Sequence, residues 1–167
     1  MLGNYYLSIF KHVFLMLFIS IFVIACDKGA EDPKEAEAEP VVPTLSDENI
    51  KSFVIKMAED YNAKRDSLLA SFNKAKGDDH VYEFVNFRNN KWTPAYIKQK
   101  DYYQSVLAQN SAYLATSSTR PLFDVYENLI YIGIGLKNAL LDNDETLLQA
   151  QLVEIQKDKE TISRTVK

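Results

Sequence analysis

"LIYIGIGL", residues 129–136, is the stretch of sequence that decides the fold. It contains only large apolar residues, one tyrosine and two glycines, so a helix built from it has no charged face to turn toward water. A helix that is apolar on all sides is buried. The stretch is too short to cross a membrane, which requires about 20 apolar residues. We therefore expect a buried helix over residues 121–141.

The two glycines of this stretch add a second expectation. Glycine in a helix interior costs about 1 kcal/mol relative to alanine, so Gly133 and Gly135 need a reason to be there. Gly135 and Ala139 form a small-xxx-small face, which predicts that the backbone of another helix comes close. The alternative is a kink that lines a cavity.

Helical spacing of apolar residues continues on the N-terminal side. The first helix is expected to begin after a Ser46 cap and to end at Gly77, with Leu45 and Ile50 as a hydrophobic staple. Asp78 or Asp79 is expected to cap a second helix, and a third is expected to restart at Thr93-Pro94 and reach about Ala115. The side chains expected to face inward are Phe53, Val54, Met57, Tyr61, Leu68, Leu69, Phe72, Val81, Phe84, Val85, Trp92, Tyr96, Tyr103, Leu107 and Leu114.

A last helix is expected after a turn at residues 142–144. Its apolar positions form a coiled-coil-like seam in which Lys159 fills a gap: Leu148, Leu152, Ile155, Ile162 and Val166. Together these patterns predict an all-α fold, an antiparallel bundle of four or five helices over residues 46–167.

The N-terminus has the organisation of a secretory signal peptide. Twelve uncharged residues, 13–24, follow Lys11 and precede the small residue Ala25. A basic region, an apolar run of 7–15 residues and a small residue at the cleavage site describe such a leader. We expect residues 1–25 to be a cleaved signal peptide. A simple signal anchor is the alternative.

The string Val23-Ile24-Ala25-Cys26 resembles the lipobox of bacterial lipoproteins. The resemblance implies cleavage before Cys26, attachment of lipid to its sulfur and acylation of the new amino terminus. It also accounts for a single cysteine in an exported chain; a buried free cysteine is the alternative. Several acyl chains give stable attachment to a bilayer. Asp27 resembles the inner-membrane retention signal of enterobacterial lipoproteins, so a periplasm-facing inner-membrane location is favoured over the outer membrane.

An acidic segment separates this anchor from the helices. Residues 27–49 hold eight acidic residues against two lysines and are interrupted by three prolines. Such a composition buries too little apolar surface to fold, so residues 26–45 are expected to be the lipidated cysteine and an extended linker. Residues 50–167 carry 16 basic and 15 acidic residues, which gives no basic block for nucleic acid.

The mature chain shows no catalytic, metal or cofactor signature. Its single histidine, His80, follows Asp78 and Asp79, where a solvated cap is expected. Zinc and di-iron sites need more histidine or cysteine ligands. Residues 142–145, DNDE, lack the glycine and the twelfth-position glutamate of a calcium loop. The sequence therefore predicts a protein that is not an enzyme and has no cofactor or metal.

Aromatic residues interleaved with cations are the remaining feature. Tyr102 and Tyr103 are separated by about 100° of helical rotation, so if Tyr103 faces inward, Tyr102 faces outward. Lys98 is one turn away from Tyr102. With Trp92 these side chains are expected to form a surface for a protein partner, because tyrosine and tryptophan are enriched at interface hot spots. The alternative is that the rings fill the core or a helix junction.

Three functions follow as hypotheses. The first is a lipid-anchored, non-catalytic protein-binding module, for example an immunity, exclusion or inhibitor lipoprotein. The second is a structural or envelope-assembly lipoprotein that acts as a spacer or scaffold, or oligomerises through its C-terminal seam. The third is a solute-binding bundle with an aromatic pocket.

Overall fold

A computed structural model describes residues 41–78 and 80–167 of the chain. These residues form helices and connecting turns, with no strand among them. The predicted all-α bundle is thereby confirmed. The predicted signal peptide, Cys26, Asp27 and the linker up to residue 40 lie outside the described residues. Among the described helices, none combines the length and the hydropathy that a membrane crossing requires.

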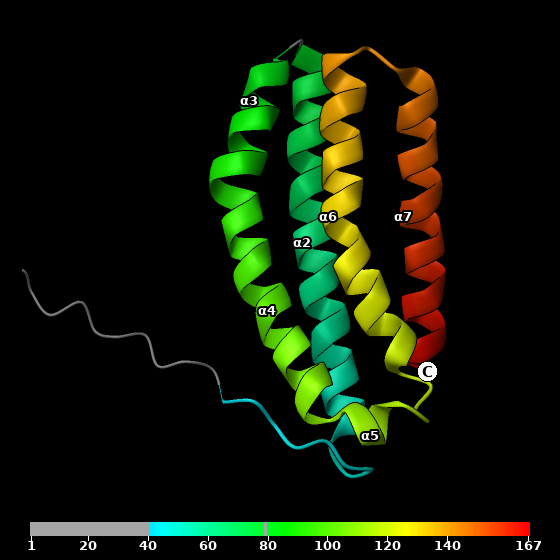
Figure 1. Ribbon diagram of the computed structural model, residues 1–167. Coiled ribbons are helices and arrows are strands. Elements are labelled where there is room, and N and C mark those ends of the chain that lie inside the picture. Colours follow the sequence, from blue (N-terminus) through cyan, green and yellow to red (C-terminus); the bar gives the residue numbers. More distant parts are fainter. Residues whose placement is uncertain (1–40, 79) are drawn as a thin grey trace, which may run out of the picture. The chain divides into compact units, whose positions relative to one another are not determined.

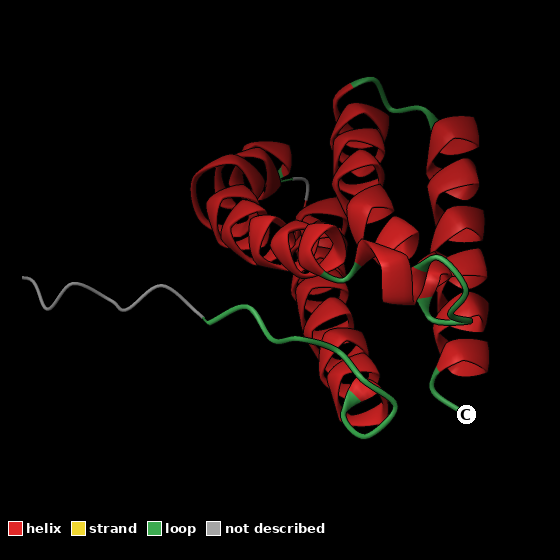
Figure 2. Cartoon of the chain, turned by 60° about the horizontal axis from the view of Figure 1, so that its bottom comes forward, coloured by secondary structure: helices red, strands yellow, loops and turns green. Residues whose placement is uncertain are grey.

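Four long helical segments lie side by side (Figures 1 and 2). They are α2 (Ile50–Asp78), then a continuous run of α3 (Val81–Phe87), η1 (Arg88–Trp92) and α4 (Thr93–Gln109), then α6 (Arg120–Leu141) and α7 (Glu145–Thr165). The short helix α5 (Ser111–Leu114) connects α4 with α6. α6 packs against α2, α3, α4 and α7. The stretch that predicted the fold is therefore in the central helix.

The ends of α2 differ from the prediction. Asn49 holds the start of the helix, because its Oδ1 accepts from the Ser46 N–H at 2.9 Å and its Nδ2 donates to the Thr44 carbonyl at 2.9 Å. Gly77 does not stop the helix: it has a negative φ and α2 continues to Asp78. The His80 N–H donates to the Ala75 carbonyl at 3.0 Å, a wide turn that closes the helix without a left-handed glycine. His80, not an aspartate, occupies the N-cap of α3.

A π-helical turn, η1, joins α3 to α4 without a break. The residues at both junctions, Arg88 and Trp92, have helical φ and ψ. Proline at position 94 has no N–H, and in a regular α-helix its ring would clash with the carbonyl of residue 90. The wider turn gives that carbonyl room. The prediction that a helix begins at Thr93-Pro94 is correct in that the hydrogen-bond pattern changes there. It is wrong in that no loop separates the two helices.

Asn110 interrupts the third predicted helix. Its backbone leaves the helical region, at φ −109° and ψ 22°, and its buried side chain binds the segment that leads into α2. Oδ1 accepts from the Leu45 N–H at 2.7 Å, and Nδ2 donates to the Pro43 carbonyl at 3.0 Å. Leu45 is part of the core. The packed domain therefore begins a few residues before the expected boundary at residue 46.

The central helix α6 runs over nearly the predicted residues, but it is not buried all round. Leu129, Ile132 and Leu136 are fully buried, whereas Tyr131 is 63% exposed and Ile134 is 37% exposed. The glycines meet side chains rather than the backbone of another helix. A Cβ at Gly133 would lie 3.4 Å from Arg88 Nε and from Trp92 Cζ3, and one at Gly135 would lie 2.3 Å from Gln151 Cδ.

The predicted turn at residues 142–144 is confirmed, but the predicted apolar seam of α7 is only partly correct. Asn143 has a φ of 50°, and the Asp144 side chain accepts from the Leu147 N–H at 2.9 Å, which caps α7. Leu148, Ile155 and Ile162 are buried as expected, whereas Leu152 and Lys159 are exposed. Gln151 and Asp158 take the positions between the buried apolar residues, at spacings of three and four.

Candidate functional site

A column of stacked rings fills the space between α4 and α6. Trp92 and Tyr96 lie with ring centroids 5.0 Å apart at an interplanar angle of 7°, and Tyr96 and Tyr126 lie 5.8 Å apart at 10°. Trp92 is 3% exposed, and its Nε1 donates to the Lys64 carbonyl at 2.9 Å. Trp92 therefore faces the core, as its place in the apolar pattern predicted, and does not belong to the exposed patch in which the sequence also placed it.

The other two residues of the predicted partner surface remain at the surface of α4. Lys98 is exposed and Tyr102 is half-buried, with its ring centroid 5.2 Å from that of Tyr103. Tyr103 faces inward, as expected. The structure therefore separates Trp92 from Lys98 and Tyr102. Partner binding by these two side chains stays a prediction.

Two carboxylates hold tyrosines of the core. Tyr61 donates to Asp158 Oδ2 at 2.8 Å, which links α2 to α7, and Tyr103 donates to Asp60 Oδ2 at 2.6 Å, which links α4 to α2. Burial first, and then the neighbouring carboxylate, raise the pKa of both phenols far above the ordinary value of 10.0. These tyrosines therefore remain neutral hydrogen-bond donors that join helices.

Asp158 is a buried carboxyl group that the sequence did not reveal. It is 6% exposed, and Asn128 Nδ2 lies 3.5 Å from its Oδ2. Burial raises the pKa of this carboxyl above 3.8, although the hydrogen bonds from Tyr61 and Asn128 act in the opposite direction. The folded state therefore binds this proton more tightly than the unfolded chain does.

Replacing Asp158 by asparagine is expected to make stability less sensitive to pH. Because the folded pKa is raised, the contribution of Asp158 to stability falls as the pH rises from about 3.8 through the folded pKa, and the loss is complete above it. Asp158→Asn keeps an acceptor for Tyr61 and should gain stability relative to wild type over that window. Urea unfolding at a series of pH values measures the difference. Asp142→Asn removes the same charge from the surface and is the control; a loss relative to wild type at rising pH would contradict the prediction.

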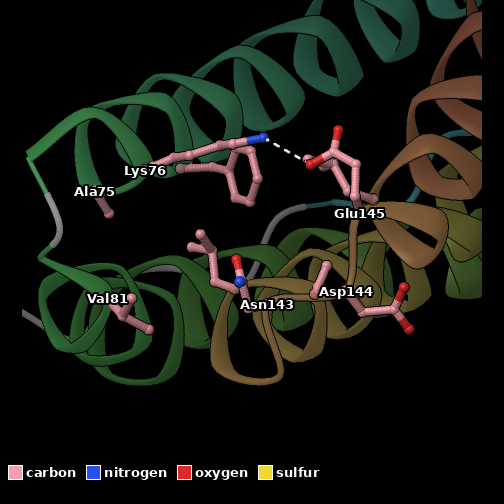
Figure 3. A pocket seen from close by; sticks show the side chains of 10 residues that line it. Ala75, Lys76, Val81, Asn143, Asp144 and Glu145 are labelled. Carbon is pink, nitrogen blue, oxygen red and sulfur yellow. Dashed lines mark hydrogen bonds and ion pairs between the residues drawn. The ribbon is translucent and has the colours of Figure 1, made fainter.

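A cavity of about 190 Å³ lies where α2 and α6 end and α3 and α7 begin (Figure 3). Its apolar wall includes Phe72 and Leu148, and its polar rim is formed by Lys76, Asn143, Asp144 and Glu145. Glu145 accepts from Gln149 at 3.0 Å and from Lys76 at 3.2 Å, and these hydrogen bonds lower its pKa. Since Asp144 caps α7 and Glu145 is paired, the polar rim fastens α2 to the start of α7.

Arg88, in the π-helical turn, is a buried cation without a carboxylate partner among the described residues. It is 7% exposed; Nη1 donates to Asn89 Oδ1 at 2.9 Å, and buried Nε has no hydrogen-bond acceptor. Its side chain lies against Gly133 of α6. Burial lowers the pKa of its guanidinium. Arg88 is not evident as a site from the sequence, because nothing in the apolar pattern predicts that a wide turn directs this side chain inward.

The side of α6 that faces away from the core carries three exposed apolar side chains, which we call the α6 outer face. They are Tyr131, Ile134 and Leu141. Their spacings of three and seven residues place them along one side of the helix. An apolar helix is normally covered on such a side.

The described part of the chain contains no group of three or more histidine, cysteine, aspartate or glutamate side chains placed to hold a metal ion. His80 is exposed, with Nδ1 3.4 Å from Glu83 Oε1. Cys26, the predicted lipidation site, lies outside the described residues.

Comparison with known proteins gives no further assignment. No protein-family model matches the chain, and neither a curated protein nor a solved structure matches it.

Proposed function

We propose that the chain is a bacterial lipoprotein, anchored in the cell envelope through Cys26, whose helical domain binds a protein partner without catalysis. The string Val23-Ile24-Ala25-Cys26 and the short apolar run before it support the anchor. Asp27 favours the periplasmic side of the inner membrane. An immunity, exclusion or inhibitor lipoprotein has this organisation: a lipid anchor, a linker and a small binding domain.

The α6 outer face is the observation that carries the binding role. α6 is apolar enough to be covered on every side, and its own chain covers the sides toward α2, α4 and α7. Apolar side chains scattered singly on a surface are normal, but these three lie along one line of the central helix. A partner with an apolar surface would complete the burial that the sequence of α6 calls for.

The scaffold hypothesis is the second candidate. Leu152 and Val153 are exposed on α7, which favours contact with a second copy of the chain. The seam itself is occupied, because Leu148, Ile155 and Ile162 are buried within the domain. The solute-binding hypothesis has less support, since the rings of Trp92, Tyr96 and Tyr126 pack against one another and leave no space between them.

The anchor is tested at the cysteine. Cys26→Ala should abolish lipid attachment and release or mislocalise the protein, because the thioether forms on this sulfur. Incorporation of labelled palmitate and membrane fractionation measure both effects. Equal label in wild type and variant would refute the lipoprotein assignment.

The binding role is tested by a photo-crosslinking amino acid placed on the α6 outer face. At position 131 it should give a discrete adduct with a partner protein in living cells, because this side chain lies in the proposed interface. Position 70, an exposed alanine on α2, is the matched control. Adducts of the same pattern at both positions would contradict the proposed face, and an adduct with twice the mass of the chain would favour the scaffold.

A further inference from the structure

We propose that Arg88 is the docking point for a carboxylate of the protein partner, so that the partner presents an acidic segment to the π-helical turn. This inference rests on the protein-binding role proposed above. It starts from the guanidinium, whose hydrogen-bonding capacity the domain leaves largely unused. Nη1 binds Asn89, whereas buried Nε has no acceptor in the described structure.

The unused edge of Arg88 suits a carboxylate. Nε is buried without an acceptor, and the residue as a whole is 7% exposed, so the guanidinium is recessed but not sealed. The planar guanidinium recognises carboxylate and phosphate groups through parallel N–H donors. The side chain is held within the domain, since it is 7% exposed and its Nε lies beside Gly133. A fixed side chain loses little entropy when a ligand binds.

The sequence around Arg88 and the facing part of α6 is rich in cations, although Lys100 pairs with Asp101 at 3.7 Å. Residues 84–100 carry Arg88, Lys91, Lys98 and Lys100, and residues 128–141 of α6 carry Lys137, whereas neither stretch contains an acidic residue. The two stretches pack together through the α3–α6 and α4–α6 contacts. Over the rest of residues 50–167 acidic residues predominate, because the total is 16 basic against 15 acidic. This concentration of positive charge steers and selects an acidic partner.

An acidic protein segment fits this place better than an anionic bilayer does. The guanidinium is recessed, at 7% exposure, so a protruding aspartate or glutamate side chain reaches it more readily than a broad lipid surface. A lipid surface would instead meet the outlying lysines. Arginine is also among the residues enriched at interface hot spots.

A buried cation without a carboxylate partner is also expected to lower the stability of the folded domain. Removing its charge while keeping its length relieves desolvation that no carboxylate offsets. Arg88→Met should therefore raise the melting temperature by about 2–4 °C and at the same time lose affinity for an acidic ligand. A residue kept only for the fold would show the opposite change in stability.

The experiment uses the full chain in nanodiscs of neutral phosphatidylcholine and a fluorescein-labelled hexaglutamate peptide, followed by polarisation. We expect the peptide to bind wild type, hexaglutamine not to bind, and Arg88→Met to weaken binding by at least about tenfold. Arg88→Lys, which keeps the charge without the planar donors, should also weaken it. Lys91→Met, which removes an exposed charge nearby, should change it less than about threefold.

The opposite outcomes are equally clear. No binding to wild type, equal losses at Arg88 and Lys91, or a lower melting temperature for Arg88→Met would overturn the assignment. Sedimentation with phosphatidylcholine–phosphatidylglycerol vesicles that depends on Arg88 would assign the site to anionic lipid instead. The peptide assay needs no cellular partner, so its failure leaves the crosslinking result at position 131 intact, and the converse also holds.

Discussion

Trp92→Ala is expected to lower the free energy of unfolding by about 3–5 kcal/mol, the usual cost of truncating a buried large aromatic side chain. Trp92 stacks on Tyr96, bonds to the Lys64 carbonyl of α2 and lies against Gly133 of α6. Its removal therefore opens a cavity where three helical segments meet. Urea unfolding followed by circular dichroism measures the loss.

Trp92→Phe is the matched control for this change. Phenylalanine keeps a ring on Tyr96 and loses the indole hydrogen bond, so the cost should fall to about 1–2 kcal/mol. Because Trp92 is the only tryptophan, its emission in wild type reports this site alone. The emission should be blue-shifted and protected from acrylamide. A red, readily quenched emission together with a small effect of Trp92→Ala would show that Trp92 is exposed and would contradict its place in the core.

Gly135→Leu is expected to lower the free energy of unfolding by about 1–3 kcal/mol through overpacking between α6 and α7. Even a Cβ at this position would lie 2.3 Å from Cδ and 2.5 Å from Oε1 of Gln151. The Gln151 side chain must move away, and the added leucine must displace it further. Thermal and urea unfolding measure the change.

A second substitution separates side-chain crowding from backbone crowding. If Gln151 is the obstacle, Gln151→Ala in the Gly135→Leu background should restore much of the lost stability. If another backbone were the obstacle, the second change would restore nothing. Gly133→Ala is the control within the same helix: its Cβ would meet neighbours at 3.4–3.5 Å, so it should be neutral or stabilise by up to about 1 kcal/mol.

Helical periodicity was enough to predict the architecture. The bounds of α6 and the turn at residues 142–144 follow from local signals: an uninterrupted apolar stretch, and an asparagine that tolerates positive φ between two aspartates. The interior of α2 follows equally well, because Met57, Tyr61 and Leu68 repeat at helical spacing and are all fully buried. Such signals depend on neighbours in sequence, which the sequence shows directly.

The features that the sequence did not reveal depend on tertiary packing. Arg88 faces inward because η1 changes the phase of the helix, and a helical wheel with constant rotation does not include that change. Asp158 was missed because a carboxylate is rarely buried without a partner, and its partner, Tyr61, is 97 residues away. The Thr93-Pro94 step predicted the start of a new helix. In the structure the helix continues through Pro94, and its turn widens to a π-helical turn just before it.

The π-helical turn also makes this segment tolerant of the loss of one residue. Phe84, Arg88, Trp92 and Tyr96 are all buried at a constant interval of four residues, an interval that would drift by about 40° per step in a regular α-helix. The wide turn absorbs that drift, as one inserted residue does in a helix. Deleting one of the exposed residues 89–91 would remove the extra residue, so Phe84 and Tyr96 would lie 11 residues apart, about 1,100° of regular winding, and would stay on one side of the helix. Phe84 would then keep its place in the core, so this deletion should be far less damaging than the same deletion at residues 97–101 in the regular interior of α4, which would turn α3 by about 100° relative to the rest of α4.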